Sequence, residues 1–168
     1  MSTIYYDYLE TPIGSLMLAG DGELLMELGF PGGKGARRHQ FDWLKNGGVF
    51  KQVKEQLFSY FAGELEKFSI PLAPQGTDFQ LQVWQALQTI PYGETLSYGE
   101  LAKQIGRPKA SRAVGAANGQ NPIPVIIPCH RVIGSSGKLV GFGGGLETKQ
   151  TLLALELEST RPTLAFGV

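Results

Sequence analysis

The chain has little of the chemistry that disulfide frameworks and metal sites need. Its 168 residues include one cysteine, Cys129, and two histidines, His39 and His130. A single cysteine excludes an intrachain disulfide framework, and one cysteine with two histidines is too small a ligand set for a structural metal site. We therefore expect no metal and no cofactor. We also expect a cytoplasmic location, where a free thiol stays reduced.

Long apolar runs are also missing. The first residues carry neither a basic region nor a long hydrophobic stretch, so we expect no signal peptide and no membrane span. The hydrophobic share of 42% is enough for a core, whereas 23 glycines and ten prolines predict many loops. The length suits one domain or two small ones.

The charge is low and unevenly placed. Only 18% of the residues are charged, and the formal net charge is zero. Between Thr95 and Val140, however, six basic residues face one acidic residue, Glu100, a local excess of five positive charges. Such a segment suits a polyanionic partner, although surface charges also cluster by chance. The basic residues are Lys103, Arg107, Lys109, Arg112, Arg131 and Lys138.

The first part of the chain predicts a small α/β unit. Short apolar stretches at 4–9, 15–19 and 24–30, joined by turns, predict an antiparallel meander. Helical spacing over 49–62, ended by Gly63, predicts one helix, and 68–72 predicts a further strand. Residues 74–76 resemble a linker, so we place a domain boundary there and divide the chain into 1–76 and 77–168.

The second part predicts helices. Thr77 with Gln80 and Ser97 with Glu100 have the spacing of capping boxes. The helix that starts at Ser97 should end at Gly106, and a second should begin at Pro108 and run to 117. Two short helices joined by a glycine-containing turn form a helix-turn-helix pattern, and the basic residues favour DNA as its partner. A last helix is expected over 146–156.

Cys129 follows a stretch that reads as a buried strand. Residues 125–127 are β-branched, and the prolines around them disfavour a helix. A cysteine there is either inert and buried or a nucleophile, and the following His130 and Arg131 favour the nucleophile. Adjacent side chains of extended backbone point apart, so His130 would act through a turn or a water molecule. Its orienting acid is one of three glutamates that spacing does not distinguish: Glu147, Glu156 and Glu158.

These residues resemble a known family. Pro128-Cys129-His130-Arg131-Val132, preceded by Asn121-Pro122-x-Pro124, is similar to the active-site signature of the O6-alkylguanine-DNA alkyltransferases. The resemblance extends from 77 to about 157. It includes Phe79-Gln80, Trp84, Ile90-Pro91-x-Gly93-Glu94, Ser97-Tyr98, Arg112-Ala113-Val114-Gly115 and Gly143-Gly144-Gly145-Leu146-x2-Lys149. It implies a ribonuclease-H-like N-terminal α/β domain with an antiparallel sheet, and a mostly helical, winged-helix-like C-terminal domain.

The resemblance also implies roles. Cys129 would accept an alkyl group from O6-alkylguanine once and irreversibly, while repair of O4-alkylthymine stays open. Glu156 would orient His130 as a water-mediated base, Asn121 would brace the turn, and Tyr98 would hydrogen-bond the guanine. A monomer would bind the minor groove of double-stranded DNA and flip the base, with cooperative binding left open. The expected DNA contacts are Arg112, Lys109, Ser111, Ala113, Gly115 and Arg131, and the expected base pocket is Val132, Leu139, Phe142 and Gly143.

Three alternatives remain beside this interpretation. Damage-binding relatives without activity typically carry tryptophan at the cysteine position, so Cys129 argues against them. The related adaptive-response regulators have an additional cysteine-rich metal domain, for which this chain has no second cysteine. A cysteine hydrolase with a Cys-His-Glu triad on an unrelated fold would show turnover and no dependence on DNA.

Overall fold

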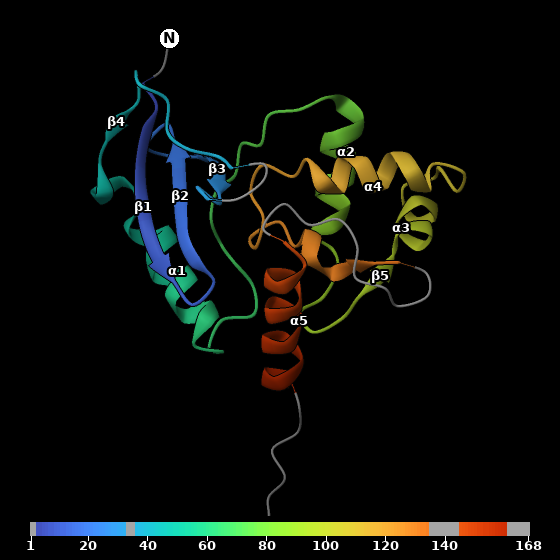
Figure 1. The fold of residues 1–168 in the computed structure, drawn as a ribbon. Helices are drawn as coiled ribbons and strands as arrows, with labels where there is room; N and C mark the ends of the chain where they lie inside the picture. The colour runs from blue at the N-terminus through green and yellow to red at the C-terminus, as the bar shows by residue number, and fades with distance from the viewer. Residues whose placement is uncertain (1–2, 33–35, 135–144, 161–168) are drawn as a thin grey trace, which may run out of the picture.

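A four-stranded sheet with one long helix forms the N-terminal half (Figure 1). The computed structural model describes residues 3–32, 36–134 and 145–160. The strands β1 (Tyr5–Thr11), β2 (Gly14–Gly20), β3 (Leu25–Gly29) and β4 (Leu44–Lys45) lie in the order β3-β2-β1-β4. The first three pair antiparallel, as expected, and β4 pairs parallel with β1. A 3-10 turn, η1 (Gly47–Phe50), leads into α1 (Lys51–Phe61).

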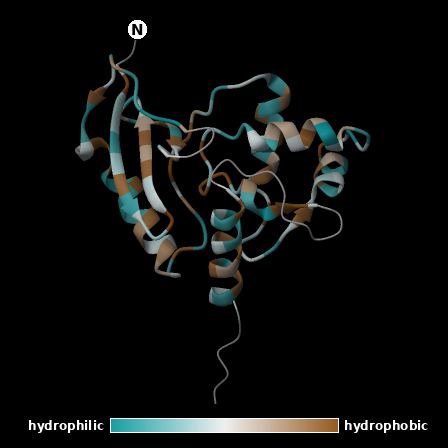
Figure 2. Cartoon of the chain, viewed as in Figure 1, coloured by the Kyte–Doolittle hydropathy of each residue, from teal (hydrophilic) through white to brown (hydrophobic). Residues whose placement is uncertain are grey.

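Glycine conformations set the ends of these elements. Gly14 and Gly22 both have φ of +102° in the two hairpin turns, a region that L side chains rarely adopt. Gly63 has φ of +77° and follows α1, where the sequence predicted a C-cap. Buried residues of α1 belong to the same hydrophobic core as those of β2. The hydropathy colouring of the ribbon in Figure 2 shows hydrophobic residues along β2.

The strand predicted over 68–72 does not form. Its only ladder contact among the described residues is an isolated parallel bridge between Leu25 and Leu72. The Leu25 N–H donates to the Pro71 carbonyl at 2.9 Å, and the Ala73 N–H donates to the Leu25 carbonyl at 2.9 Å. Pro71 and Pro74 have no N–H to donate, so this edge segment cannot extend its pairing.

Four helices and a short parallel strand pair form the C-terminal half (Figure 1). The helices are α2 (Asp78–Leu87), α3 (Tyr98–Gln104), α4 (Ser111–Gly119) and α5 (Leu146–Thr160). Strand β5 (Leu96–Ser97) pairs with β6 (Val132–Ile133), and the 3-10 turn η2 (Cys129–Arg131) precedes β6. Both predicted capping boxes are present, at the starts of α2 and α3.

Helix α4 starts later than the sequence predicted. Residues 107–110 form a turn closed by the Ala110 N–H and the Arg107 carbonyl at 2.9 Å, and the helix begins at Ser111 rather than at Pro108. Lys109 therefore lies in the turn before α4 and not on the helix. Helix α5 runs one turn beyond the predicted end, to Thr160.

The strand predicted over 125–127 is also wrong. These residues form a tight, buried loop in which Val125 has φ of +75°. The Ile127 N–H donates to the Ile123 carbonyl at 2.9 Å, a bond of one helical turn. Three prolines at 122, 124 and 128 remove donors that a strand ladder would need. Burial of the apolar side chains was anticipated correctly, but their backbone conformation was not.

One hydrophobic core connects the two halves. It contains Leu16 and Leu57 from the sheet unit and Val114 and Leu152 from the helices. Trp84 of α2 donates through its indole N–H to the Ala117 carbonyl of α4 at 2.8 Å, and the Leu28 N–H of β3 donates to the Pro122 carbonyl at 2.9 Å. The second bond ties the loop before Cys129 to the sheet.

Candidate active site around Cys129

Asn121 closes the loop that presents Cys129. Its side-chain Nδ2 donates to the Ile127 carbonyl at 2.7 Å, and its Oδ1 accepts from the Ile123 N–H at 3.0 Å. The Asn121 side chain is 6% exposed, so these bonds form away from solvent. Because they satisfy two backbone groups of a strained loop, Asn121 fixes the position from which Cys129 starts.

The Cys129 thiol is protonated in this setting. The residue is 4% exposed and stands at the first position of η2. Burial raises the pKa of the thiol to about 11, against the opposing influence of the Asn121 side chain and of the Lys149 charge. A thiol with so high a pKa needs a base to become the nucleophilic thiolate.

His130 and Glu156 form a buried pair beside this thiol. His130 Nε2 lies 2.6 Å from Glu156 Oε2, and the two residues are 0% and 1% exposed. Of the three glutamates that the sequence left open, only Glu156 of α5 reaches His130, whereas Glu147 and Glu158 are exposed on the same helix. The residue implied by the family resemblance is thus the one that touches the histidine.

The Glu156 carboxylate accepts hydrogen bonds from several directions. Arg131 Nε and Nη2 donate to its two oxygens at 2.8 and 3.0 Å, and the Gly93 N–H donates at 3.2 Å. The hydroxyl of Tyr60, on α1 of the other half, donates to Oε2 at 2.6 Å. Burial alone would raise the pKa of Glu156, but the hydrogen bonds from His130 and Arg131 outweigh it and lower that pKa to about 2.

This arrangement determines the histidine tautomer. Since Glu156 is ionised and can only accept, His130 Nε2 carries the proton and donates it. Burial lowers the pKa of His130 despite the bond to Glu156, so the ring is neutral at pH 7. Its Nδ1 then holds a lone pair, is buried, and has no hydrogen-bond partner among the described residues. An acceptor of this kind suits a general base that reaches its proton through one water molecule.

Arg131 is buried and does not lie on the surface expected to meet DNA. We assigned it to DNA, but it is 6% exposed, and its Nη1 donates to the Ile90 carbonyl at 2.7 Å while two other nitrogens bind Glu156. A guanidinium so buried and engaged does not fit a contact with phosphate. Arg131 is therefore not a DNA contact in this structure. Its charge instead stabilises the buried carboxylate of Glu156, which needs a cation beside it.

Lys149 of α5, the last residue of the Gly143-Gly144-Gly145-Leu146-x2-Lys149 motif, is a site residue for which the sequence predicted no role. It is 0% exposed, and its Nζ donates to the Val132 carbonyl at 2.6 Å. Burial lowers the pKa of Lys149, and the negative charge of a Cys129 thiolate raises it. The signal for this role was a lysine at helical spacing from Leu152 and Glu156, the other buried residues of α5. Lysine is almost never fully buried without a partner.

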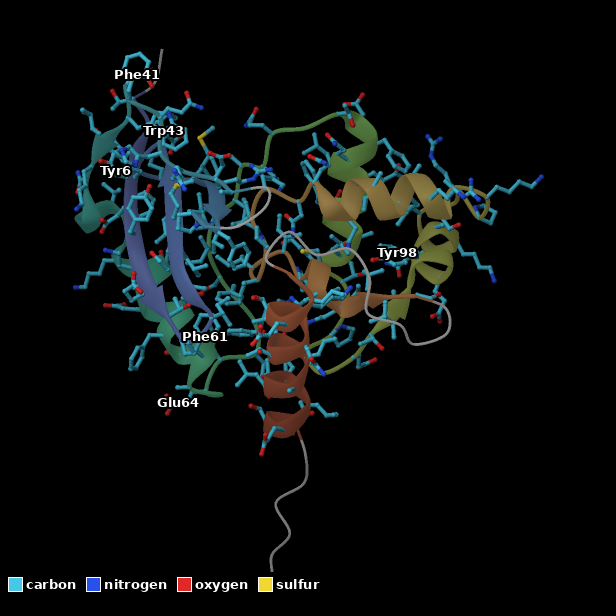
Figure 3. All side chains as sticks on the ribbon, in the orientation of Figure 1. Tyr6, Phe41, Trp43, Phe61, Glu64 and Tyr98 are labelled. Atoms are coloured by element: carbon cyan, nitrogen blue, oxygen red, sulfur yellow. The ribbon has the colours of Figure 1, made fainter. Side chains whose placement is uncertain are left out.

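Tyr98 lies at the start of α3, under α4 in the view of Figure 3. A side-chain carbon added at Gly115 of α4 would stand 3.7 Å from the Tyr98 ring, an ordinary van der Waals distance, so the ring lies directly beside this position of the helix. Burial raises the pKa of Tyr98, the Cys129 charge adds to this, and the Asn118 side chain opposes it. Asn118 Nδ2 also lies 3.4 Å from the Cys129 carbonyl. Tyr98 is therefore near Cys129.

Helix α4 exposes small residues and a cation. Arg112 and Ala113 are exposed, as is Ala116 one turn later, whereas Ser111 and Gly115 are half-buried. Lys109 is exposed in the preceding turn, and Arg107 lies over the Phe79 ring at 5.6 Å from its centroid. This face lacks bulky side chains and offers positive charge, which suits close approach to a polyanion.

The predicted base pocket is described only in part. Val132 is fully buried in β6, beside Leu96 of β5. Leu139, Phe142 and Gly143 lie outside the described residues. A cavity of about 160 Å³ reaches Cys129 from the side of the N-terminal half, with Phe30, Asn118 and Pro124 in its wall.

Residues 37–39, which include the second histidine, contact other residues of the N-terminal half. Arg37 pairs with Glu27 at 2.8 Å, and Arg38 Nε donates to the Pro31 carbonyl at 2.9 Å. His39 stacks on Tyr6 at 3.9 Å between ring centroids. Tyr6 and the neighbouring aromatics Phe41 and Trp43 lie far from Tyr98 in Figure 3. His39 therefore does not join Cys129 in a ligand set, and the described residues contain no cluster that could hold a metal ion.

Fold and site together define a class of protein with two parts: a sheet-containing half, and a helix-turn-helix half in which one cysteine lies beside a buried His-Glu pair. Comparison with known proteins agrees with this class. Residues 4–74 match the family described as 6-O-methylguanine DNA methyltransferase, ribonuclease-like domain, and residues 78–158 match its DNA binding domain. The chain belongs to this family.

Relatives cover nearly the whole chain. A methylated-DNA--protein-cysteine methyltransferase of Methanosarcina acetivorans is 54% identical over 91% of this chain and 98% of its own length. That of Mycolicibacterium paratuberculosis is 56% identical over 91% and 92%. The crystal structure of the Mycobacterium tuberculosis O6-methylguanine methyltransferase has a TM-score of 0.88 at 48% identity, covering 99% of this chain and all of that one. A structure of the M. tuberculosis protein in complex with DNA has a TM-score of 0.85 at 52% identity, covering 92% and 94%.

The described residues contain no helix that is long and apolar enough to cross a membrane.

Proposed function

We propose that this protein repairs DNA by moving an alkyl group from O6 of guanine to Sγ of Cys129, once per molecule. The observation that carries the proposal is the buried Cys129 beside the His130–Glu156 pair, 2.6 Å between Nε2 and Oε2. The relatives named methylated-DNA--protein-cysteine methyltransferase, and the neighbour solved with DNA, support it. A free thiol that must stay reduced also supports a cytoplasmic location.

The reaction follows from the protonation states. His130 Nδ1 takes the thiol proton through one water molecule, and Glu156 stabilises the imidazolium that results. The thiolate attacks the alkyl carbon in line, the S–C bond forms, and the C–O6 bond breaks with its electron pair going to the guanine. The guanine anion then takes up a proton, which restores an unmodified guanine within the DNA strand. The S–C bond of the product thioether is stable and is not cleaved by another thiol, so the protein is spent.

Residues around the cysteine would orient the base. Tyr98, packed against Gly115, would donate a hydrogen bond to the guanine as its leaving oxygen gains charge. The carbonyls of Cys129 and Val132 would accept from the guanine amino group. The Val132 carbonyl already accepts from Lys149 at 2.6 Å, and a carbonyl has a second lone pair for the base. Leu139, Phe142 and Gly143 would complete the pocket.

Helix α4 would hold the DNA. Chemistry on a stacked base requires its extrusion, which costs about a few kcal/mol. Exposed Arg112 would occupy the gap left in the duplex, and small residues such as Ala113 would let the helix approach the minor groove. Lys109, in the turn before α4, would neutralise phosphate. A monomer suffices for this geometry, and we place the boundary between its two domains at residue 76.

Mass spectrometry tests the proposal directly. The protein is incubated with duplex DNA that contains one O6-methylguanine, and the peptide with Cys129 is then weighed. We expect one added methyl group on Cys129 and at most one per protein, with Cys129→Ser binding the DNA without transfer. Methyl on another residue, or several turnovers per molecule, would overturn the proposal and favour a hydrolase.

A further inference from the structure

Tyr60 stands out because it reaches the site from the other half of the molecule. It lies near the end of α1, the helix of the sheet-containing half. Its side chain is 0% exposed. Its hydroxyl donates to Glu156 Oε2 at 2.6 Å, across 96 positions of sequence. The same oxygen is the acceptor for His130 Nε2 at 2.6 Å.

Sharing one oxygen couples the two donors. A carboxylate oxygen divides its negative charge among the hydrogen bonds it accepts, and a short bond from a phenol weakens its pull on a second proton. Tyr60 cannot supply the bond as a phenolate, because burial and the Glu156 charge raise the pKa of its hydroxyl far above the ordinary value. It is therefore a fixed neutral donor.

The other groups that face the pair are known. Arg131 binds both carboxylate oxygens, and the Gly93 N–H binds Oε1. The charges of Arg131 and Lys149 both act against a proton on His130. Tyr92 lies beside Tyr60 at 6.1 Å between ring centroids and under Arg131 at 5.7 Å. Tyr60 is thus the one neutral side chain among the described residues that donates to Glu156 apart from His130 itself.

We propose that Tyr60 is a positioning residue for alkyl transfer, which sets the basicity and orientation of His130 through the shared Glu156 oxygen. The sheet-containing half then contributes to the chemistry and not only to the fold. This inference rests on the proposed function, because His130 is the base that Tyr60 tunes. With the hydroxyl gone, Glu156 Oε2 holds the His130 proton more strongly, the pKa of His130 rises, and the neutral ring needed as a base persists only at higher pH.

Tyr60→Phe removes only the hydroxyl, and Tyr92→Phe is its matched control. The Tyr92 hydroxyl is buried in the same cluster but has no hydrogen-bond partner among the described residues. The two variants remove the same atom from neighbouring rings, so a general loss of packing would affect both. Only the loss of the bond to Glu156 would separate them.

The decisive measurement is an NMR titration of imidazole nitrogens in the full-length protein. The chain has two histidines, so His39 serves as an internal reference for His130. For Tyr60→Phe we expect the pKa of His130 to rise by about half a unit or more, and Tyr92→Phe to leave it in place. In a Glu156→Gln background the effect of Tyr60→Phe should disappear. No shift in Tyr60→Phe, or an equal shift in Tyr92→Phe, would overturn the inference.

Kinetics give the second readout and separate this inference from the proposed function. The single-turnover rate with free O6-benzylguanine is measured against pH, so that DNA binding plays no part. The acid limb should move to higher pH in Tyr60→Phe alone. If the wild-type protein transfers no alkyl group while the His130 shift is present, the proposed function fails and the coupling stands. If transfer occurs and the limb does not move, the inference fails.

Discussion

His130 Nε2 lies 2.6 Å from Glu156 Oε2, in surroundings where neither side chain is more than 1% exposed. The contact joins the residue after the only cysteine to a helix 26 positions later. It determines which ring nitrogen carries the proton, and therefore which one can take a proton from Cys129. The first two predictions concern this pair.

Glu156→Gln should reduce both transfer and stability. The amide keeps the shape but leaves Arg131 buried without its carboxylate, and loss of one partner of a buried ion pair costs about 3–5 kcal/mol. Transfer should fall by about 100-fold or more, because His130 loses the acceptor that fixes its tautomer. Urea unfolding and single-turnover assays measure the two effects. Glu158→Gln, on the exposed side of α5, is the control and should leave both unchanged.

The same pair predicts a loss of stability in acid. The pKa of Glu156 is lowered to about 2, below its ordinary value, so its contribution is complete above about pH 5 and is lost as pH falls toward 2. The pKa of His130 is also lowered, so the unfolded chain binds a proton first, and stability starts to fall below about pH 6.5. The free energy of unfolding, measured from pH 8 to 3, should decline through both ranges. A flat profile in wild type, or the same decline in Glu156→Gln below pH 5, would contradict the assignment.

Lys149→Met should make the Cys129 thiol less reactive. Burial raises the pKa of this thiol to about 11, and the Lys149 charge is one of the influences that hold it from rising further. The variant should therefore be alkylated more slowly by iodoacetamide at pH 8, and its labelling rate should rise only at higher pH. Lys103→Met removes a charge from the surface of α3 and should label like the wild type. Equal labelling of all three proteins would exclude this role for Lys149.

Arg112→Ala should separate DNA repair from the chemistry. Arg112 is exposed on α4 and makes no described contact with the site, so its loss should slow repair in duplex DNA while the reaction with free O6-benzylguanine stays near wild type. Repair should fall by about 10-fold or more, since base extrusion costs a few kcal/mol that the inserted side chain helps to offset. Lys51→Ala, on the surface of α1, is the matched control for charge. An equal loss with both substrates would argue against a role in extrusion.

Local features of the fold could be predicted because their causes are local. The capping boxes at Thr77 and Ser97 need only a hydroxyl and a side-chain acceptor three residues apart, and both are present. Gly63 and Gly106 end helices with φ of +77°, a conformation that glycine adopts without strain. The short strands of the first half also follow from turns and alternation.

Predictions failed where particular hydrogen bonds or prolines override the propensity of a segment. Residues 125–127 have strand propensity but form a turn, because Asn121 and the Ile123 carbonyl bind their backbone. Segment 68–72 makes one bridge because Pro71 and the following Pro74 have no N–H to donate to a ladder. Arg131 looked like a cation for DNA, and only the position of α5 shows that Glu156 binds it.

The sequence by itself determined the candidate nucleophile, the helical frame and the family, because a single cysteine, capping residues and the Pro-Cys-His-Arg-Val motif are all short-range signals. Tertiary structure decided which acid serves His130. Glu147, Glu156 and Glu158 lie on one helix, and packing buries only Glu156, beside His130, Arg131 and Tyr60. The physical reason is that a buried carboxylate requires donors on several sides, and here those donors come from three segments that no sequence spacing connects.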